Sequence, residues 1–147
     1  MTRRVPPAIL DQLAALPLFA GCNRRELEAL SRIGTHISVE PGHVLTRQGR
    51  LGHEFFVVVQ GEAHCAIDGN DVGRYGPGDF FGEMSLLDHQ VRSATVTADS
   101  PMELLTIDAR EFGAMLHEAP TSARRILQTL SERVRAAQAA ATTAAEA

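Results

Sequence analysis

Three residues in the middle of the chain, Gly82, Glu83 and Arg92, have the chemistry of a site for one small anion. Gly82 follows a Gly-Pro-Gly turn and precedes an apolar segment, Glu83 to Leu87, that is long enough for one or two helical turns. The first N–H groups of a helix lack internal partners and carry partial positive charge, and glycine lets a ligand approach the backbone closely. Arg92 can add a fixed guanidinium. Because Glu83 supplies an acceptor beside the anion, a ligand with both a phosphate and a sugar hydroxyl suits these groups.

Other uses of these side chains are weaker. Glu83 and Arg92 could form a structural ion pair, but a pair partly inside a barrel loses hydration and stabilises a fold little. The chain has six histidines, and none of them stands in an H-x-H or H-x-x-x-H pattern. No Ser/His/Asp constellation or H-E-x-x-H motif is present. Because Arg92 cannot release a proton, we expect a binding site with no metal, no cofactor and no catalysis.

Helices are expected on both sides of this region. Asn23 is a suitable N-cap, with Glu26 as its reciprocal acceptor. Asp108 is the N-cap of a later helix, and Pro120 pre-sets the first turn of the last one. Hydrophobic spacing and these signals together predict helices over residues 8–16, 24–33, 109–118 and from Pro120 onward.

Between the helices the hydrophobic pattern has a period of two, which is typical of strands. The run Glu54 to Val59 is almost entirely apolar and predicts a central, buried strand. Asp68-Gly69 is a tight hairpin signal. About eight short strands separated by frequent turns predict a double-sheet jelly roll. The strands that the pattern delimits cover residues 35–39, 43–46, 54–59, 62–67, 72–75, 94–98 and 102–107.

The chain is therefore expected to be one domain over residues 1–147, mainly β with flanking helices. Its core would be a double-stranded β-helix, or jelly roll, over residues 34–107. N-terminal helices over residues 8–33 and a C-terminal helical lid over residues 108–141 would cover it. Residues 142–147 are expected to form a frayed tail.

The last helix carries an apolar stripe that repeats at alternating intervals of four and three residues. Two interpretations stay open: the stripe packs on its own roll, which we favour, or it pairs with a second copy in a homodimer. The stripe consists of Ala123, Leu127, Leu130, Val134, Ala137 and Ala141.

Composition excludes several classes of protein. The formal net charge of −4 argues against direct nucleic-acid binding. No apolar run approaches the roughly 18 residues of a membrane span, and the two N-terminal arginines are not followed by the apolar region of a signal peptide. Cys22 and Cys65 lie far apart without a motif around them, which is typical of free thiols in a reducing compartment. We expect a cytoplasmic protein.

The run from Phe81 to Val96, F-G-E-M-S-L-L-x-x-x-x-R-S-A-T-V, resembles the phosphate-binding cassette of the cyclic nucleotide-binding domain family. That family includes the protein kinase A regulatory subunit, the bacterial catabolite activator protein and cyclic nucleotide-gated channels. The L-P-L-F turn near residue 18 and the glycines around Phe55 to Val58 are similar to the family as well. Thr46 and Arg50 depart from its pattern, which usually has an aliphatic residue and a small polar or acidic residue there.

The resemblance implies roles for residues of the cassette, which spans residues 81–96. In the family the arginine pairs with the cyclic phosphate and the glutamate accepts the ribose 2′-hydroxyl, which implies these roles for Arg92 and Glu83. Backbone amides of the short helix and of the residue after the arginine complete the cradle. The ligand-binding residues so implied are Gly82, Glu83, Met84, Ser85, Arg92, Ser93 and Ala94.

The resemblance also implies a ligand and a mode of signalling. A threonine after the cassette arginine accompanies cGMP and an alanine accompanies cAMP; Ser93 stands between them, and the cAMP-binding bacterial activator has serine. We therefore expect cAMP, with cGMP as the other candidate, and Arg133 or Arg135 of the last helix over the base. Movement of the C-terminal helices would signal to an effector outside this chain. The alternatives are a degenerate domain used for protein contact and a cupin-like metal enzyme.

Overall fold

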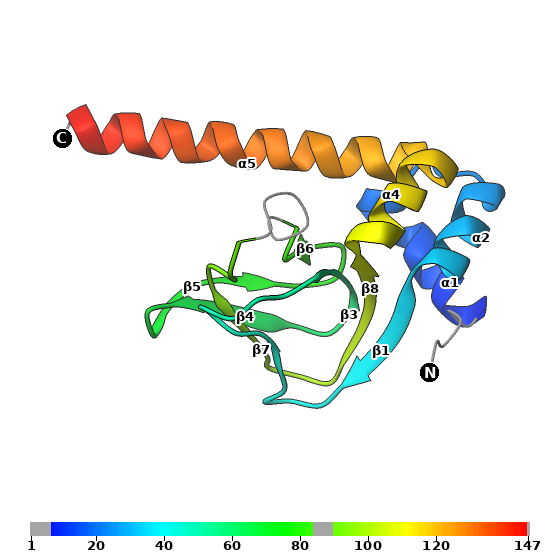
Figure 1. Ribbon diagram of the computed structural model, residues 1–147, viewed down its shortest axis with the longest axis horizontal. Coiled ribbons are helices and arrows are strands. Elements are labelled where there is room, and N and C mark those ends of the chain that lie inside the picture. Colours follow the sequence, from blue (N-terminus) through cyan, green and yellow to red (C-terminus); the bar gives the residue numbers. More distant parts are fainter. Residues whose placement is uncertain (1–6, 84–89, 147) are drawn as a thin grey trace.

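The computed structural model describes residues 7–83 and 90–146, and it contains two four-stranded antiparallel sheets with helices packed on them (Figure 1). The strand order is β1-β8-β3-β6 in one sheet and β2-β7-β4-β5 in the other. This is the mainly β roll with flanking helices that the sequence predicts. The strands are β1 (Thr35–Val39), β2 (Val44–Thr46), β3 (Glu54–Gln60), β4 (Ala63–Ile67), β5 (Asn70–Tyr75), β6 (Phe80–Phe81), β7 (Thr95–Ala98) and β8 (Met102–Asp108).

The strand β3 shows why the two layers hold together. Its residues from Phe55 to Val59 are all buried. Phe55, Val57 and Val59 belong to the core between the helices and the first sheet, whereas Phe56 and Val58 belong to the core between the two sheets. A strand covered on both faces needs apolar residues at every position. This explains why the sequence shows a continuous apolar run here rather than an alternating one.

The helices gather at one end of the roll and along its side. The predicted N-caps are confirmed: α2 and α4 each begin with a capping box, formed by Asn23 with Glu26 and by Asp108 with Glu111. Glu26 also accepts a hydrogen bond of 3.1 Å from the N–H of Thr121, which ties the first turn of α5 to α2. The helices are α1 (Pro7–Ala15), the 3₁₀ helix η1 (Pro17–Phe19), α2 (Arg24–Ile33), α4 (Ala109–Glu118) and α5 (Pro120–Glu146).

The long helix α5 runs along the roll and extends past it (Figure 1). Among its described side chains, the buried ones lie in the first turns and are Ser122, Ala123 and Ile126. The predicted packing stripe is partly wrong, because it omits Ile126 and includes Leu127 and Val134, which are 54% and 57% exposed. The packed face is rotated from the predicted one, and the homodimer interpretation stays open. The helix also continues to Glu146 rather than ending at residue 141, since alanine has the highest helix propensity.

Local differences from the sequence-based expectations are small. The hairpin at Asp68 and Gly69 is confirmed, with φ of +53° and +79°. The strand β6 follows directly on the Gly-Pro-Gly turn and was not delimited from the sequence, because a strand of two residues has no periodicity to detect. Residues 84–87 of the short helix expected after Gly82 lie outside the described residues.

Candidate ligand-binding site

Gly82 and Arg92 lie against each other at the end of β6. The φ of Gly82 is +86°, a conformation that glycine adopts without steric cost. A Cβ at Gly82 would lie 2.7 Å from Nη1 of Arg92, and a Cβ at Gly52 would overlap the same guanidinium. Both glycines therefore make room for the arginine, and a larger residue at either position would displace it.

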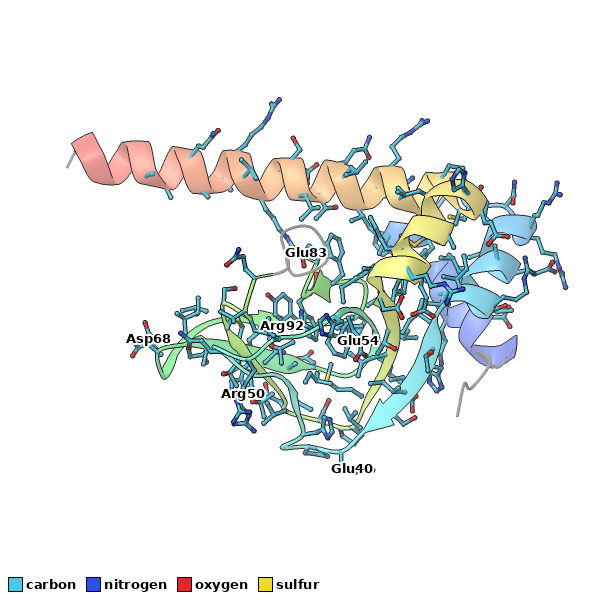
Figure 2. All side chains as sticks on the ribbon, in the orientation of Figure 1. Glu40, Arg50, Glu54, Asp68, Glu83 and Arg92 are labelled. Atoms are coloured by element: carbon cyan, nitrogen blue, oxygen red, sulfur yellow. The ribbon has the colours of Figure 1, made fainter. Side chains whose placement is uncertain are left out.

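The guanidinium of Arg92 is fixed inside the roll (Figure 2). Arg92 is 8% exposed, and it donates hydrogen bonds of 3.0 Å to the carbonyl of Gly82 and 2.5 Å to the carbonyl of Glu54. Burial lowers the pKa of Arg92, while the carboxylates of Glu54 and Glu83 act in the opposite direction. The side chain stays charged, because a guanidinium does not lose its proton in proteins. The backbone N–H of Arg92 donates to the carbonyl of Arg50 at 2.8 Å, so the main chain is anchored as well.

Glu83 lies between the sheets and α5, and it pairs with an arginine of that helix (Figure 2). Its Oε1 accepts a hydrogen bond of 2.6 Å from Nη1 of Arg133. Nη2 of Arg133 donates to the carbonyl of Phe80 at 3.0 Å, and its guanidinium carbon lies 4.5 Å from the centroid of the Phe80 ring. Among residues 7–83 and 90–146, Glu83 forms its ion pair with Arg133.

The second oxygen of this carboxylate, Oε2, differs from Oε1 in its contacts. The Glu83 side chain is 10% exposed, and within the described part of the chain no hydrogen bond reaches its Oε2. A carboxylate oxygen can accept bonds along two lone pairs, so Oε2 can accept from a hydroxyl while Oε1 keeps Arg133. One side chain can in this way contact both a ligand and α5.

A cavity of about 60 Å³ lies at the centre of these groups. It is far smaller than the roughly 300–1,000 Å³ of pockets that enclose drug-sized ligands. The groups around it are thus close together in this structure. The cavity is lined by Thr46, Tyr75, Phe81, Gly82, Arg92, Ser93, Ala94 and Val96.

The structure gathers most of the residues that the sequence singled out. Gly82, Arg92, Ser93 and Ala94 all line the cavity, and Glu83 directly follows Gly82. Met84 and Ser85 lie outside the described residues. On α5, Arg133 reaches Glu83, whereas Arg135 is exposed to solvent. The binding roles assigned to these residues stay predictions.

Three contributors were not found from the sequence. Glu54 accepts a hydrogen bond from Arg92 through its backbone carbonyl, a contact that no side-chain pattern can indicate. Thr46 is buried, and its hydroxyl donates to the carbonyl of Ala94 at 3.0 Å, so a polar residue is tolerated where the family has an aliphatic one. Tyr75 lines the cavity at the end of β5, and its place just before the Gly-Pro-Gly turn was the available signal.

Among residues 7–83 and 90–146, no group of three His, Cys, Asp or Glu side chains could hold a metal ion. Within the same part of the chain, no helix is both long and apolar enough to span a bilayer. Cys22 and Cys65 are both free thiols, and burial raises the pKa of each.

Comparison with known proteins agrees with this geometry. The cyclic nucleotide-binding domain family matches residues 36–119, which is more than half of the 147 residues. The chain belongs to the cyclic nucleotide-binding domain family. The matched segment of this cyclic nucleotide-binding domain runs from β1 to the end of α4, so it includes both sheets and the cavity.

Individual relatives include both regulators and channels. The crystal structure of the Thermus thermophilus catabolite activator protein is similar with a TM-score of 0.77 and 30% identity, over 86% of this chain and 62% of that one. A cAMP-binding acyltransferase from Mycobacterium smegmatis has a TM-score of 0.72 and 31% identity, over 88% of this chain and 41% of that one. A cyclic nucleotide-gated potassium channel of Mesorhizobium japonicum is 36% identical over 87% of this chain.

The relatives are longer than this domain. The chain spans 36% of the Mesorhizobium japonicum channel and 34% of a cyclic nucleotide-gated potassium channel of Rhizobium etli. In these proteins most of the length lies outside the segment that matches.

Proposed function

We propose that this domain is a regulatory module that binds a 3′,5′-cyclic nucleotide, with cAMP preferred over cGMP, and that it catalyses no reaction itself. The observation that supports this most is the buried guanidinium of Arg92, which lines a cavity together with Gly82 and Ser93. A cyclic phosphodiester is a single negative charge that matches one arginine.

The phosphate would be held mainly by Arg92. Charge-assisted hydrogen bonds contribute about 1.5–3 kcal/mol each. A bidentate guanidinium contact with a few backbone amide bonds can therefore approach the roughly −8 kcal/mol of a micromolar complex. Because Arg92 is already held by two carbonyls, little side-chain entropy is lost on binding.

The sugar would be held by Glu83. Its Oε2 can accept a hydrogen bond from the ribose 2′-hydroxyl, while Oε1 stays bonded to Arg133. A nucleotide with a 2′-deoxyribose would lose this bond and bind more weakly. A linear 5′-phosphate is a dianion without the ring that places phosphate and 2′-hydroxyl side by side, so it should also bind weakly.

The preference for cAMP rests on Ser93 and on the relatives. Ser93 lines the cavity beside Arg92, where threonine would favour guanine. Two of the similar structures are described as cAMP-bound or cAMP-binding, at 25% and 31% identity.

Signalling would pass through α5. We expect the small cavity to widen when a nucleotide binds. Arg133 connects α5 to both Glu83 and Phe80, so the helix and the cassette open and close together. A bound ligand that hydrogen-bonds Glu83 then favours the arrangement in which α5 is closed over the site. The ligand shifts this equilibrium only by its differential affinity for the two states.

The effector would lie outside residues 1–147, in another part of a longer chain or in another protein. In a similar channel and in a similar protein kinase regulatory subunit, the matching segment is 36% and 26% of the protein, so most of each protein lies outside it. We expect a cytosolic module that contacts this effector through the C-terminal helices and does not bind nucleic acid directly.

Calorimetric titration with cAMP and cGMP tests the proposal, with 5′-AMP as the matched control. We expect one site, micromolar affinity for cAMP, weaker binding of cGMP and little heat with 5′-AMP. Absence of heat and of thermal stabilisation with both cyclic nucleotides at millimolar concentration would contradict the proposal.

A second function is favoured by the small cavity. The family fold could serve protein contact alone, with Arg92 and Glu83 as structural groups. In that case neither cAMP nor cGMP binds the wild-type protein. Exchange of Arg92 for alanine then changes only the thermal stability of the fold.

A further inference from the structure

Charge is divided unevenly between the β-roll and the helices. Residues 34–108, which include both sheets, contain four arginines and eleven acidic residues, so their net charge is −7. The rest of the chain contains ten arginines and seven acidic residues, which gives +3 and accounts for the formal net charge of −4. The helices can therefore present a basic surface, although the chain as a whole is acidic.

Two hollows on the helical side adjoin at the start of α5. One, of about 390 Å³, lies between α2 and the end of α4, and the other, of about 340 Å³, lies along the first turns of α5. Pro120 lines both, and the helices that form them meet at one end of the molecule (Figure 1). We call the two hollows together the α2–α5 groove. Four arginines line it, Arg25 and Arg32 from α2 and Arg124 and Arg125 from α5.

The four arginines of the groove have no acidic partners in the described part of the chain. Arg25, Arg32 and Arg124 are exposed, and Arg125 is half-buried. Among residues 7–83 and 90–146, none of the four forms an ion pair with a carboxylate, whereas Arg133 further along α5 does. Their positive charge is thus not neutralised by ion pairs within these residues.

Two acidic residues also line the groove, and they offset only half of this charge. The carboxylate of Glu26 accepts hydrogen bonds of 3.1 Å from both the N–H and the hydroxyl of Thr121, so it is already used by α5. The second acidic residue, Glu118, is exposed. Because Glu26 fixes the first turn of α5 against α2, the two walls of the groove are held together before a partner binds, which limits the entropy cost of binding.

We propose that the α2–α5 groove is a docking site for a carboxylate-rich segment of the effector protein. This inference rests on the proposed function, which requires an effector but does not say what chemistry it presents. Arginine clusters recognise acidic segments, because a guanidinium can donate two parallel hydrogen bonds to a carboxylate. Four arginines against two acidic residues give the charge complementarity that selects such a segment over a basic one.

The groove also connects docking to the position of α5. Arg124 and Arg125 follow the anchored first turn of the helix, so their place relative to Arg25 and Arg32 depends on the direction that α5 takes. A segment that contacts both walls favours the direction seen in this structure, with α5 along the roll. In the proposed function cAMP favours the same arrangement, so the segment and cAMP should strengthen each other's binding by the same factor.

Fluorescence anisotropy of a labelled decaglutamate peptide, added to the full chain, tests the inference. We expect saturable binding that weakens as the salt concentration rises, because exposed charges are screened. Saturating cAMP should tighten it about fivefold, the lower end of typical coupling between two sites. Absence of peptide binding in a protein that binds cAMP by calorimetry overturns the inference alone. Peptide binding without any heat from cAMP overturns the proposed function and leaves the groove as a docking site.

Charge reversal on both walls locates the bound peptide. We expect Arg25→Glu combined with Arg124→Glu to weaken decaglutamate about tenfold or more, since attraction becomes repulsion at two exposed sites. Arg47→Glu combined with Arg50→Glu is the matched control, because it reverses two exposed arginines of the roll and changes the net charge equally. Calorimetry with cAMP checks that both variants fold. Equal losses of peptide affinity in the two variants would overturn the assignment to the groove.

Two further measurements identify the occupant. A protein segment is favoured over a nucleic acid, because the roll beside the groove has a net charge of −7 and repels a long polyanion. A labelled oligothymidylate should therefore bind more weakly than decaglutamate, and tighter binding that the groove variant loses would overturn the proposal in favour of a nucleic acid. Light scattering at low salt should give the same mass for the wild type and the groove variant. A larger species in the wild type alone would assign the groove to a second copy of the chain.

Discussion

The two charged residues of the candidate site are held in different ways. Within the described residues, Arg92 is held by carbonyls of the β-roll, those of Gly82, Glu54 and Arg50. Glu83 is held by Arg133, which comes from the helix α5. Both side chains are almost fully buried, so burial does not distinguish them.

In the proposed function, this difference separates binding from signalling. Arg92, which we propose holds the phosphate, is held by carbonyls of the roll, so we expect it to stay organised whether α5 is open or closed. Glu83, which we propose holds the sugar, is paired with Arg133, so we expect its position to depend on α5 lying over the roll. A ligand that uses both residues therefore favours the closed helix, whereas an anion that uses Arg92 alone does not.

Removal of the Arg92 side chain should have the largest effect on cAMP affinity. We expect Arg92→Ala to weaken cAMP about a hundredfold or more, because several charge-assisted bonds are lost together. The melting temperature should also fall, since the carbonyls of Gly82 and Glu54 lose their donor. Calorimetry and thermal unfolding measure the two effects, with the exposed Arg50→Ala as control. Unchanged cAMP affinity in Arg92→Ala would contradict the role of Arg92 in holding the phosphate.

Neutralising the Glu83 carboxylate should have an intermediate effect on cAMP affinity. Glu83→Gln keeps the shape of the side chain but loses its charge, so we expect about tenfold weaker cAMP binding. It should also accelerate amide hydrogen exchange in α5, because the ion pair with Arg133 is lost. The exposed Glu40→Gln serves as control. If α5 exchanges at the wild-type rate in Glu83→Gln, the carboxylate does not hold the helix.

Releasing the helix while keeping the carboxylate should have a smaller effect on affinity. We expect Arg133→Ala to weaken cAMP about threefold to tenfold, since its side chain is 39% exposed and such pairs contribute modestly. Inorganic phosphate and other small anions should bind this variant as they bind the wild type. Arg135→Ala, on the same helix but exposed, should change neither quantity. Equal effects of the two substitutions on cAMP affinity would show that the contact between Arg133 and Glu83 does not contribute to binding.

The outer face of α5 should matter least to the ligand. Leu127→Gln and Val134→Gln alter residues that are more than half exposed, so cAMP affinity should stay within about a factor of two. Size-exclusion chromatography with light scattering of the same variants tests the homodimer interpretation. A loss of affinity as large as that of Arg133→Ala would mean that this face contributes to the site.

The sequence predicted the surroundings of Arg92 better than the contact between Glu83 and α5. Gly82 and Arg92 belong to one short motif whose spacing is nearly unique, and the caps at Asn23 and Asp108 are local signals. Which arginine of α5 meets Glu83 depends on the rotation of the helix on the roll, and an Ala-rich helix leaves that rotation poorly marked. The same ambiguity placed Leu127 rather than Ile126 on the packed face. The inward direction of Tyr75 depends on strand register, which only the pairing of β4 with β5 decides.

Hydrogen exchange of the wild-type protein with and without saturating cAMP tests the central claim most directly, with the core strand β3 as internal reference. The account predicts slower exchange in the cassette and also in α5 around Arg133, with β3 unchanged. Protection confined to the cassette, with α5 exchanging at the same rate in both samples, would contradict it.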